Sequence, residues 1–462
     1  MSRKWTPQQK NAIYATDGSV LVSAAAGSGK TAVLVERVIK LITREKNPLD
    51  VDRLLIVTFT RAAAAEMRER IQAAVNKLLE DDPYNAHLLA QRQLLYSANI
   101  STIDSFCGDI VREYFHTLDV ARDFRIADEG ELEILRQEAL DNTFESFYDS
   151  EDDCFYSLLD LFKGKQGDQK LRETVLKISK FLTTQPFPDK WLDDMLENYS
   201  ETDIEKTVWG KIIIDYALSA VLHGINLTEN SILRLKDDEK LQDAVEPLLV
   251  GDLAYFTHVQ LKFVSSSWDE IRQAIFSFET GKMKSPKGYK DNPIKNSISS
   301  NRDEVKKTVK KLQSLFFWSE EDARLELSQL HRFISTLFTL VRAYDKKLSK
   351  LKAKKNILSF ADIESLTVKL LAKPDDENGY TRTVQAQEIS NRFDAVMVDE
   401  FQDVNDVQDL IFKSVSNDES NLFVVGDVKQ SIYGFRQAKP EIFIERKNEY
   451  KRFDEENLEY PA

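Results

Sequence analysis

The chain has 462 residues, of which 42% are hydrophobic and 30% charged, and its formal net charge is −14. This composition excludes a disordered chain, and the length predicts two or three domains. We expect a cytoplasmic protein without a membrane partner, because no continuous apolar run reaches ~18 residues and the first ten residues lack the apolar core of a signal peptide. The two cysteines, Cys107 and Cys154, exclude a disulfide framework.

Three zones follow one another along the chain. Residues 1–120 contain the short apolar runs GSVLVSA and RLLIVTFT, each followed by apolar residues at helical spacing. Residues 121–355 carry long helical patterns without a convincing strand, and strand-like runs return at residues 356–462 in FDAVMVDE and NLFVVGD. The order predicts an α/β domain with a parallel sheet, split by a large, mainly helical inserted domain.

The first predicted strand-to-helix turn has the sequence AAAGSGKT, in which Ala24 replaces the first glycine of the usual phosphate-binding loop. Backbone N–H groups and a helix N-terminus at such a turn can hold phosphates. We expect Lys30 to reach the terminal phosphates and Thr31 to ligate Mg²⁺. The predicted nucleotide-binding residues of this loop are Ala24, Ala25, Ala26, Gly27, Ser28, Gly29, Lys30 and Thr31. The loop alone does not decide whether the site is intact.

A second acidic motif, FDAVMVDEFQD, supplies the partner that such a loop needs. Four apolar residues lead into Asp399 and Glu400, so both carboxylates follow a predicted buried strand. One carboxylate there can hold Mg²⁺, and the next can orient and deprotonate the attacking water. We therefore predict ATP and Mg²⁺ as ligands, with Thr31 and Asp399 on the metal and with Lys30, Asp399 and Glu400 as catalytic residues.

Two further features suggest nucleic acid. Thr60 and Arg61 open a helix directly after an apolar strand, where hydroxyl, guanidinium and amide groups can hold a DNA phosphate, and Phe59 is a candidate ring for stacking on a base. Lysines gather in residues 282–311 and again in residues 346–355. Such runs are either a solvated surface or a phosphate-binding arm that grips the duplex, and the sequence leaves both interpretations open.

In chain order, these segments resemble the motifs of superfamily 1 DNA helicases of the UvrD/Rep/RecB group, and among them the AddA (RexA) type of helicase–nuclease subunit. The resemblance implies a RecA-like P-loop NTPase domain in which AAAGSGKT is a normal nucleotide loop. It further implies that Gln9 in WTPQQKNAI reads adenine and that Gln430 in VVGDVKQSIYGFRQA senses the γ-phosphate as a catalytic residue. The residues implied in DNA contact are Phe59, Thr60, Arg61, Thr102, Ser105, Phe435 and Arg436.

Two departures favour the AddA type over compact UvrD-like helicases. Lys30 and Asp399 lie far apart in the chain, and Ala32 stands where UvrD-like proteins usually have arginine. The resemblance implies the N-terminal motor domain of an ATP-dependent 3′–5′ DNA helicase–nuclease in double-strand break repair and recombination, paired with an AddB-like subunit. We find no second RecA-like domain or nuclease motif within the 462 residues and expect incomplete turnover. The alternatives are part of a UvrD/Rep-type repair helicase, and a non-catalytic module that binds ATP, DNA or a partner.

Overall fold

The computed structural model describes residues 4–15, 18–25, 27–163, 167–417, 419–431 and 438–451. The chain divides into two compact units. The first unit comprises Met1–Asp152, Phe162–Trp191 and Leu340–Ala462, and the second comprises Asp153–Leu161 and Leu192–Thr339. The sequence predicted an inserted domain at residues 121–355, and these boundaries stay a prediction.

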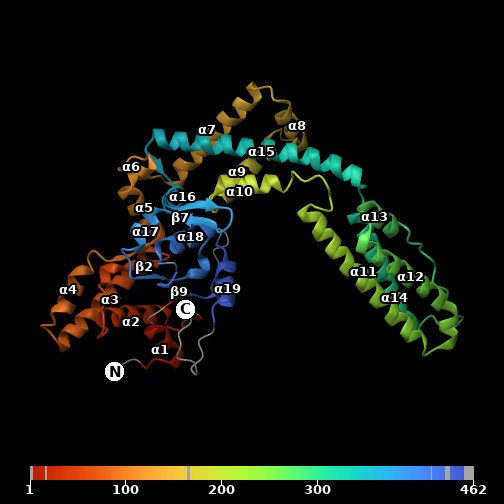
Figure 1. The fold of residues 1–462 in the computed structure, drawn as a ribbon, viewed down its shortest axis with the longest axis horizontal. Coiled ribbons are helices and arrows are strands. Elements are labelled where there is room, and N and C mark those ends of the chain that lie inside the picture. Colours follow the sequence, from red (N-terminus) through yellow and green to blue (C-terminus); the bar gives the residue numbers. More distant parts are fainter. Residues whose placement is uncertain are drawn as a thin grey trace. The chain divides into compact units, whose positions relative to one another are not determined.

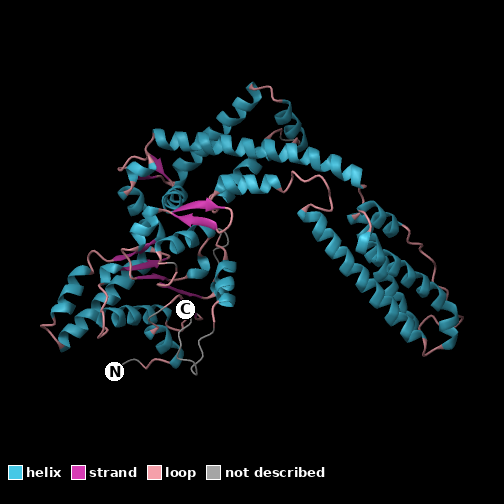
Figure 2. Ribbon diagram, viewed as in Figure 1, coloured by secondary structure: helices cyan, strands magenta, loops and turns pink. Residues whose placement is uncertain are grey.

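The helices and strands alternate at both ends of the chain, whereas its middle is helical (Figures 1 and 2). Up to residue 149 the elements are α1 Pro7–Tyr14, β1 Val20–Ser23, α2 Lys30–Thr43, η1 Val51–Arg53, β2 Leu54–Thr58, α3 Arg61–Asp81, α4 Ala86–Leu94, β3 Asn99–Thr102, α5 Ile103–Glu113, α6 Phe115–Leu118, β4 Arg125–Ile126 and α7 Glu129–Asp149. The middle contains α8 Asp153–Phe162, α9 Gln169–Leu182, α10 Pro188–Glu197, α11 Val208–Leu235, α12 Glu239–Ser265, α13 Trp268–Phe276, α14 Pro293–Leu315 and α15 Glu320–Lys354. The last part contains β5 Ile357–Leu358, α16 Phe360–Leu371, β6 Ala372–Asp375, β7 Gly379–Arg382, α17 Val384–Ser390, β8 Ala395–Val398, η2 Phe401–Asp403, α18 Asp406–Val415, β9 Leu422–Gly426, η3 Val428–Gln430 and α19 Pro440–Glu449.

The first unit is built on a five-stranded sheet with the order β1-β9-β8-β2-β3, and each neighbouring pair is parallel. The three central strands, β9, β8 and β2, are buried along their whole length. Their sequences LFVVG, AVMV and LLIVT are continuous apolar runs, as a parallel sheet covered on both faces requires. The sheet confirms the predicted α/β class.

Successive residues of the central strands enter two different cores, because side chains alternate across a sheet. Leu55 and Val57 of β2 pack in a cluster with residues of α5, α16 and α18. Leu54 and Ile56 pack on the other face with residues of α2 and α3. The first unit is therefore a three-layer arrangement in which helices cover both faces of the sheet.

The sequence did not predict β4, a two-residue strand at Arg125–Ile126 that pairs in parallel with β5 at Ile357–Leu358. This pairing joins the two ends of the segment expected to lack strands. Two residues are too few to produce an alternating pattern, so the position of β4 is set by the tertiary contact with β5.

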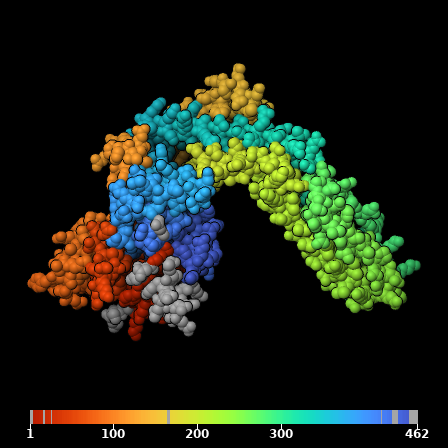
Figure 3. All heavy atoms as spheres, in the orientation of Figure 1, coloured from red at the N-terminus to blue at the C-terminus, as the bar shows by residue number. Residues whose placement is uncertain are grey.

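The second unit is a helical bundle in which α11, α12, α13 and α14 pack around an aromatic core. Figure 3 shows one face of this bundle with all heavy atoms drawn as spheres. Trp268 stacks on Phe316 with ring centroids 4.2 Å apart. Gly224 of α11 lies against the ring of Phe256 so closely that a Cβ atom there would come within 2.5 Å of it. Helix contacts and aromatic packing alone define this unit, since residues 192–339 contain no strand.

Helix α11 departs from the expectation that no segment qualifies as a membrane span. By length and composition it is apolar enough to cross a membrane, with an 18-residue window of mean hydropathy 1.3, and 22% of that window is buried. Helices of water-soluble proteins also pass this test. A single helix of this kind is weak evidence, so α11 by itself does not indicate a membrane protein.

Candidate functional site

The loop between β1 and α2 explains why an alanine is accepted at the first position of the phosphate-binding motif. The N–H of Ala24 donates to Gly426 O at 3.0 Å, which continues the pairing of β1 with β9. Neither Ala24 nor Ala25 is among the non-glycine residues with positive φ. The left-handed conformations lie instead at Gly27 (φ 73°) and Gly29 (φ 86°), where glycine carries no steric cost. Ala26 lies outside the described residues.

Helix α2 begins at Lys30, directly after Gly29 as its N-cap, and no side chain of the described residues caps it. The N-terminus of a helix carries partial positive charge and N–H groups without partners inside the helix, which suits a phosphate. Thr31 follows within the first turn. Gln9 lies beside this loop, and its Nε2 donates to Ser28 O at 2.9 Å. The structure therefore places Gln9 and the loop together, as the predicted adenine and phosphate roles require.

Arg37 of α2 is a residue that the sequence reasoning missed. It is 5% exposed, and its Nη1 donates to Ala12 O at 2.8 Å and to Ala15 O at 2.5 Å. Its guanidinium lies over the ring of Phe423, 4.2 Å from the centroid, and burial lowers the pKa of Arg37 to about 10. Arg37 thus ties the C-terminal end of α1, the helix that carries Gln9, to α2 and to the sheet. A lone arginine in a helical pattern gives no signal of such a role.

The two predicted acids emerge from the end of β8 opposite the loop. Lys30 Nζ lies 2.8 Å from Glu400 Oε2, and only 9% of the lysine side chain is exposed. The N–H of Asp399 donates to Val57 O, and the N–H of Glu400 donates to Asp399 Oδ1, each at 3.0 Å. Glu400 has φ 53°, a left-handed conformation that is uncommon for a non-glycine residue and is often found at functional sites.

The electrostatics of this pair differ from those of free carboxylates. Burial and, to a smaller extent, the neighbouring Glu400 carboxylate raise the pKa of Asp399, while the Glu400 N–H and Lys30 oppose these effects, and together they place the pKa at about 6. At neutral pH the Asp399 carboxylate is ionised in a poorly solvated position, where a cation would stabilise it. Mg²⁺ is usually held by one or two carboxylates, phosphates and waters. Thr31 and Asp399 fit that donor set, and within the described ranges no cluster of three or more His, Cys, Asp or Glu side chains offers an alternative.

The segment after β9 is placed only in part. Gln430 Nε2 donates to Asp427 Oδ2 at 2.5 Å, and this contact is the main reason that the pKa of Asp427 is lowered. In this structure the Gln430 side chain thus points toward Asp427, and its γ-phosphate role stays a prediction. Phe435 and Arg436 lie outside the described residues.

The predicted DNA contacts follow the neighbouring strands at the same edge of the sheet. Strands β2 and β3 are parallel, with Thr58 opposite Thr102. Thr60 caps α3 by accepting from Ala63 N at 3.1 Å, and Thr102 caps α5 and also lies 3.0 Å from Ser105 Oγ. Thr60 and Arg61 are exposed, Phe59 and Ser105 are half-buried, and Thr102 is buried. The carboxyl edge thus carries the loop and acids after β1, β8 and β9, the exposed Thr60 and Arg61 after β2, and the less exposed hydroxyls of Thr102 and Ser105 after β3.

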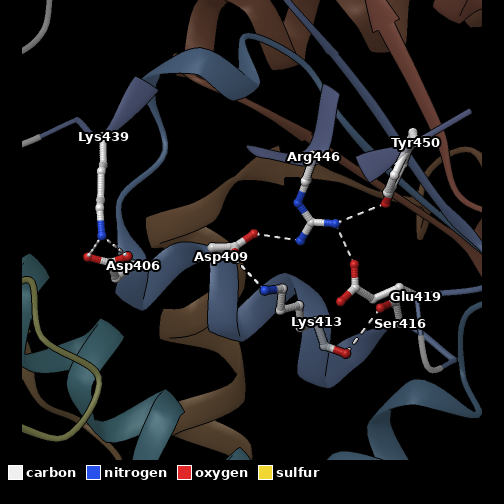
Figure 4. A network of polar contacts seen from close by, with 8 residues as sticks. All are labelled: Asp406, Asp409, Lys413, Ser416, Glu419, Lys439, Arg446 and Tyr450. Carbon is white, nitrogen blue, oxygen red and sulfur yellow. Dashed lines mark hydrogen bonds and ion pairs between the residues drawn. The ribbon is translucent and has the colours of Figure 1, made fainter. Parts of the chain in front are cut away.

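A polar network fixes the helix that follows β9 (Figure 4). Arg446 of α19 is 5% exposed and donates to Asp409 of α18 at 2.8 Å and also to Glu419. Burial alone would lower the pKa of Arg446, but these two carboxylates raise it above its ordinary value. Outside this cluster, Lys439 pairs with Asp406 at 2.9 Å. The chain on either side of residues 432–437 is therefore anchored to the first unit.

The parallel sheet, the loop at the start of α2 and the lysine–carboxylate contact together define a P-loop NTPase domain of RecA-like fold. The family model for the UvrD/REP helicase N-terminal domain matches residues 5–451, and the chain belongs to this family.

The curated relatives agree with the predicted resemblance. The chain is 37% identical over 465 residues to a protein of Clostridium perfringens (strain SM101 / Type A) that is named as the A subunit of an ATP-dependent helicase/nuclease. Proteins of the same name from Clostridium beijerinckii and Bacillus cereus (strain AH820) are 39% and 38% identical. These matches cover 97–99% of this chain but only 36–37% of the relatives, so the chain spans about a third of their length. The resemblance to AddA-type subunits is confirmed.

Proposed function

We propose that this chain is the first motor domain of an ATP-dependent 3′–5′ DNA helicase–nuclease subunit that processes DNA double-strand breaks for recombination. The observation that carries the proposal is the contact between Lys30 and Glu400, beside Asp399, at the carboxyl edge of the sheet. A lysine at the start of a helix, facing a carboxylate pair at the end of a buried strand, is the arrangement that holds and hydrolyses a nucleoside triphosphate.

Each residue of the site has one proposed task. Gln9 binds the adenine edge, and the loop from Ala24 to Thr31 holds the phosphates with its N–H groups and Lys30. Thr31 and Asp399 hold Mg²⁺, which supplies neutralising charge to the phosphates when bound. Glu400 orients the attacking water and accepts its proton. Since Lys30 is paired with Glu400 in this structure, movement of Lys30 to a phosphate also removes the lysine from the base.

The DNA track is proposed to run over the ends of β2 and β3. Thr60, Arg61, Thr102 and Ser105 would contact backbone phosphates, and Phe59 would stack on a base. Strand β2 lies directly beside β8, which carries the acid pair. A shift at the nucleotide site can therefore reach the DNA contacts through adjacent strand ends. In the predicted roles, Gln430, Phe435 and Arg436 join the two sites.

The remaining parts of the proposal concern the larger assembly. We propose that arginines from a second RecA-like domain complete the ATP site, because such arginines supply orders of magnitude in rate. We further propose a cytoplasmic protein with an AddB-like partner subunit. The relatives are named as one lettered subunit of a helicase/nuclease, which supports the existence of a partner.

The test is Mg²⁺-ATP binding and hydrolysis by the chain itself, with and without single-stranded DNA. We expect binding in titration calorimetry and slow turnover that DNA stimulates little. Glu400→Gln should keep the affinity and remove the residual hydrolysis. Absence of ATP binding by the folded chain would contradict the nucleotide site, and rapid DNA-stimulated turnover by a verified monomer would contradict the need for a second domain.

A further inference from the structure

Gln402 connects the acid pair to the segment after β9. It lies in η2, directly after the left-handed turn at Glu400, and is 1% exposed. Its Nε2 donates to Glu400 Oε2 at 2.9 Å and to Asp403 Oδ2 at 3.2 Å. Its Oε1 accepts from the N–H of Asp427 at 2.9 Å. The amide nitrogen of Gln402 thus bonds to the acids after β8, and its amide oxygen bonds to Asp427 after β9.

The amide group has little freedom to move. It lies against Gly426, the last residue of β9, where a Cβ atom would come within 2.6 Å of Gln402 Oε1 and 2.8 Å of the Phe443 ring. Any side chain at Gly426 would displace either the amide or the ring. The glycine therefore lets the glutamine approach the end of the strand closely.

The Glu400 carboxylate receives two donors at the same oxygen. Lys30 Nζ lies 2.8 Å and Gln402 Nε2 2.9 Å from Oε2. If Lys30 moves to a phosphate, the glutamine amide remains to hold the carboxylate. On its other side, Gln402 fixes the N–H of Asp427, and the Asp427 carboxylate binds Gln430. A continuous series of hydrogen bonds runs from Glu400 through Gln402 and Asp427 to Gln430.

We propose that Gln402 is a positioning residue that holds Glu400 for water activation and couples that carboxylate to the turn from Asp427 to Gln430. The role of Glu400 as base rests on the proposed function. The coupling itself is a property of the nucleotide-free chain. Buried hydrogen-bond networks can transmit displacement in this way, because loss of one bond leaves a buried group unsatisfied.

The first test is the rate of ATP hydrolysis in a single turnover, with the chain in excess over Mg²⁺-ATP. Gln402→Met removes all three hydrogen bonds of the amide, whereas Gln402→Glu keeps the acceptor for Asp427 and removes the donor to Glu400 and Asp403. We expect both variants to slow the chemical step by about 10- to 100-fold, with ATP affinity nearly unchanged, since misplacement of a base affects the chemistry and not the binding. Gln408→Met is the matched control: it removes a glutamine–carboxylate bond to Glu364 in the same unit and should leave the rate unchanged. A wild-type rate in both Gln402 variants, or equal losses of rate and affinity, would overturn the proposal.

The second test needs no nucleotide. Hydrogen exchange of residues 427–430 is compared in the wild type, Glu400→Ala, Gln402→Met and the double variant. We expect Glu400→Ala to speed exchange by about 2- to 10-fold when Gln402 is present, the factor of one hydrogen bond, and to have no effect in the Gln402→Met background. Equal effects in both backgrounds would refute the coupling. If the wild type neither binds nor hydrolyses ATP, the proposed function fails. The hydrogen-exchange comparison of the four proteins still decides whether Gln402 couples Glu400 to residues 427–430.

Discussion

The carboxyl edge of the sheet and the helical second unit place their polar side chains by different means. At the edge, Lys30, Asp399 and Asp427 come from distant parts of the sequence, and each follows the end of a parallel strand. In the second unit, the lysines of α14 are neighbours in one helix, and the packing of other elements decides where each one points. Strand ends therefore specify a site through topology, whereas a helical surface specifies it only through packing.

Both units nevertheless contain one deeply buried arginine–aspartate pair. In the first unit Arg446 pairs with Asp409, and in the second unit Arg302 pairs with Asp252 at 2.7 Å, with side chains 3% and 4% exposed. Arg302 also donates to Gly281 O at 2.6 Å, which holds the segment after α13 against α12 and α14. A substitution in either pair should therefore lower the stability of one unit, because both residues of each pair belong to the same unit.

The largest effects are expected from breaking these pairs. Arg302→Met should lower the free energy of unfolding of the second unit by about 3–5 kcal/mol, because the buried Asp252 carboxylate loses its partner. Arg446→Met should weaken the first unit by less, because Asp409 keeps its ion pair with Lys413 at 3.0 Å. Hydrogen exchange, which follows the stability of each unit separately, is the measurement. Lys439→Met, which breaks the exposed pair with Asp406, should cost less than about 1 kcal/mol. Equal loss of protection in both units from either variant would show that the units are one cooperative structure.

The next effect tests the sheet edge as a nucleotide site. Lys30→Ala should weaken Mg²⁺-ATP binding by about 100-fold, because the variant cannot form a charge-assisted hydrogen bond to a phosphate. Calorimetric titration gives the affinity. Lys40→Ala is the control in the last turn of the same helix, where Lys40 is half-buried, forms a long 4.0 Å pair with Glu36 and lies 5.8 Å from the centroid of the Tyr14 ring. Similar losses in both variants would mean that general charge, rather than the edge geometry, attracts the nucleotide.

A smaller effect follows from the raised pKa of Asp399, which is about 6. Its carboxylate must be ionised to hold Mg²⁺, so the Mg²⁺-dependent part of ATP affinity should fall by about tenfold per pH unit below pH 6. The pH dependence of folding stability has the opposite sign to that of ATP affinity. The folded state retains this proton up to about pH 6, so the ionised carboxylate costs stability as the pH rises from about 4 to 6.

Asp399→Asn separates the effect of this carboxylate on folding stability from its effect on Mg²⁺-dependent ATP binding. At pH 7.5 it should stabilise the first unit by on the order of 1 kcal/mol, because a buried charge is removed, and at pH 4 it should not. The same variant should lose the Mg²⁺ dependence of ATP binding at every pH. Thermal unfolding at the two pH values gives the first result. A destabilised variant at pH 7.5 would show that the Asp399 charge is already well compensated by Lys30.

The sequence predicted what depends on strand ends and missed what depends on packing. Buried runs such as AVMV identified the strands, and the residues that follow these runs identified Lys30, Asp399 and Glu400. Arg37 and Gln402 were not assigned roles, because each bonds a backbone group more than twenty residues away, Ala15 O for Arg37 and Asp427 N–H for Gln402, and the sequence gives no signal of such contacts. Strand β4 was missed since two residues carry no pattern. In the second unit, the sequence predicted helices but not which lysines share a pocket.

The smallest expected effect concerns those lysines, which we propose to contact the phosphates of duplex DNA. A pocket of about 590 Å³ in the second unit is lined by Lys282, Lys306 and Lys310, together with Arg302 and Asp303. Lys307 and Lys311 of the same helix are exposed and lie outside this lining. The structure thus divides four neighbouring lysines into two pairs, and in the pocket pair Lys306 also lies 3.2 Å from the Asp303 carboxylate.

The pairs Lys306→Gln/Lys310→Gln and Lys307→Gln/Lys311→Gln make the test, because each removes two charges from α14. Removing one lysine–phosphate interaction should reduce the slope of log affinity against log salt by about one unit, independently of DNA sequence. We expect the variant of the pocket pair to reduce the slope of duplex binding by about two units, because two lysines that line the same pocket can both contact phosphates of one DNA strand. The variant of the outer pair should reduce the slope by less. Equal reductions would mean that the whole face of α14 contacts DNA. An unchanged slope in both variants would leave these lysines as a solvated surface on an acidic protein.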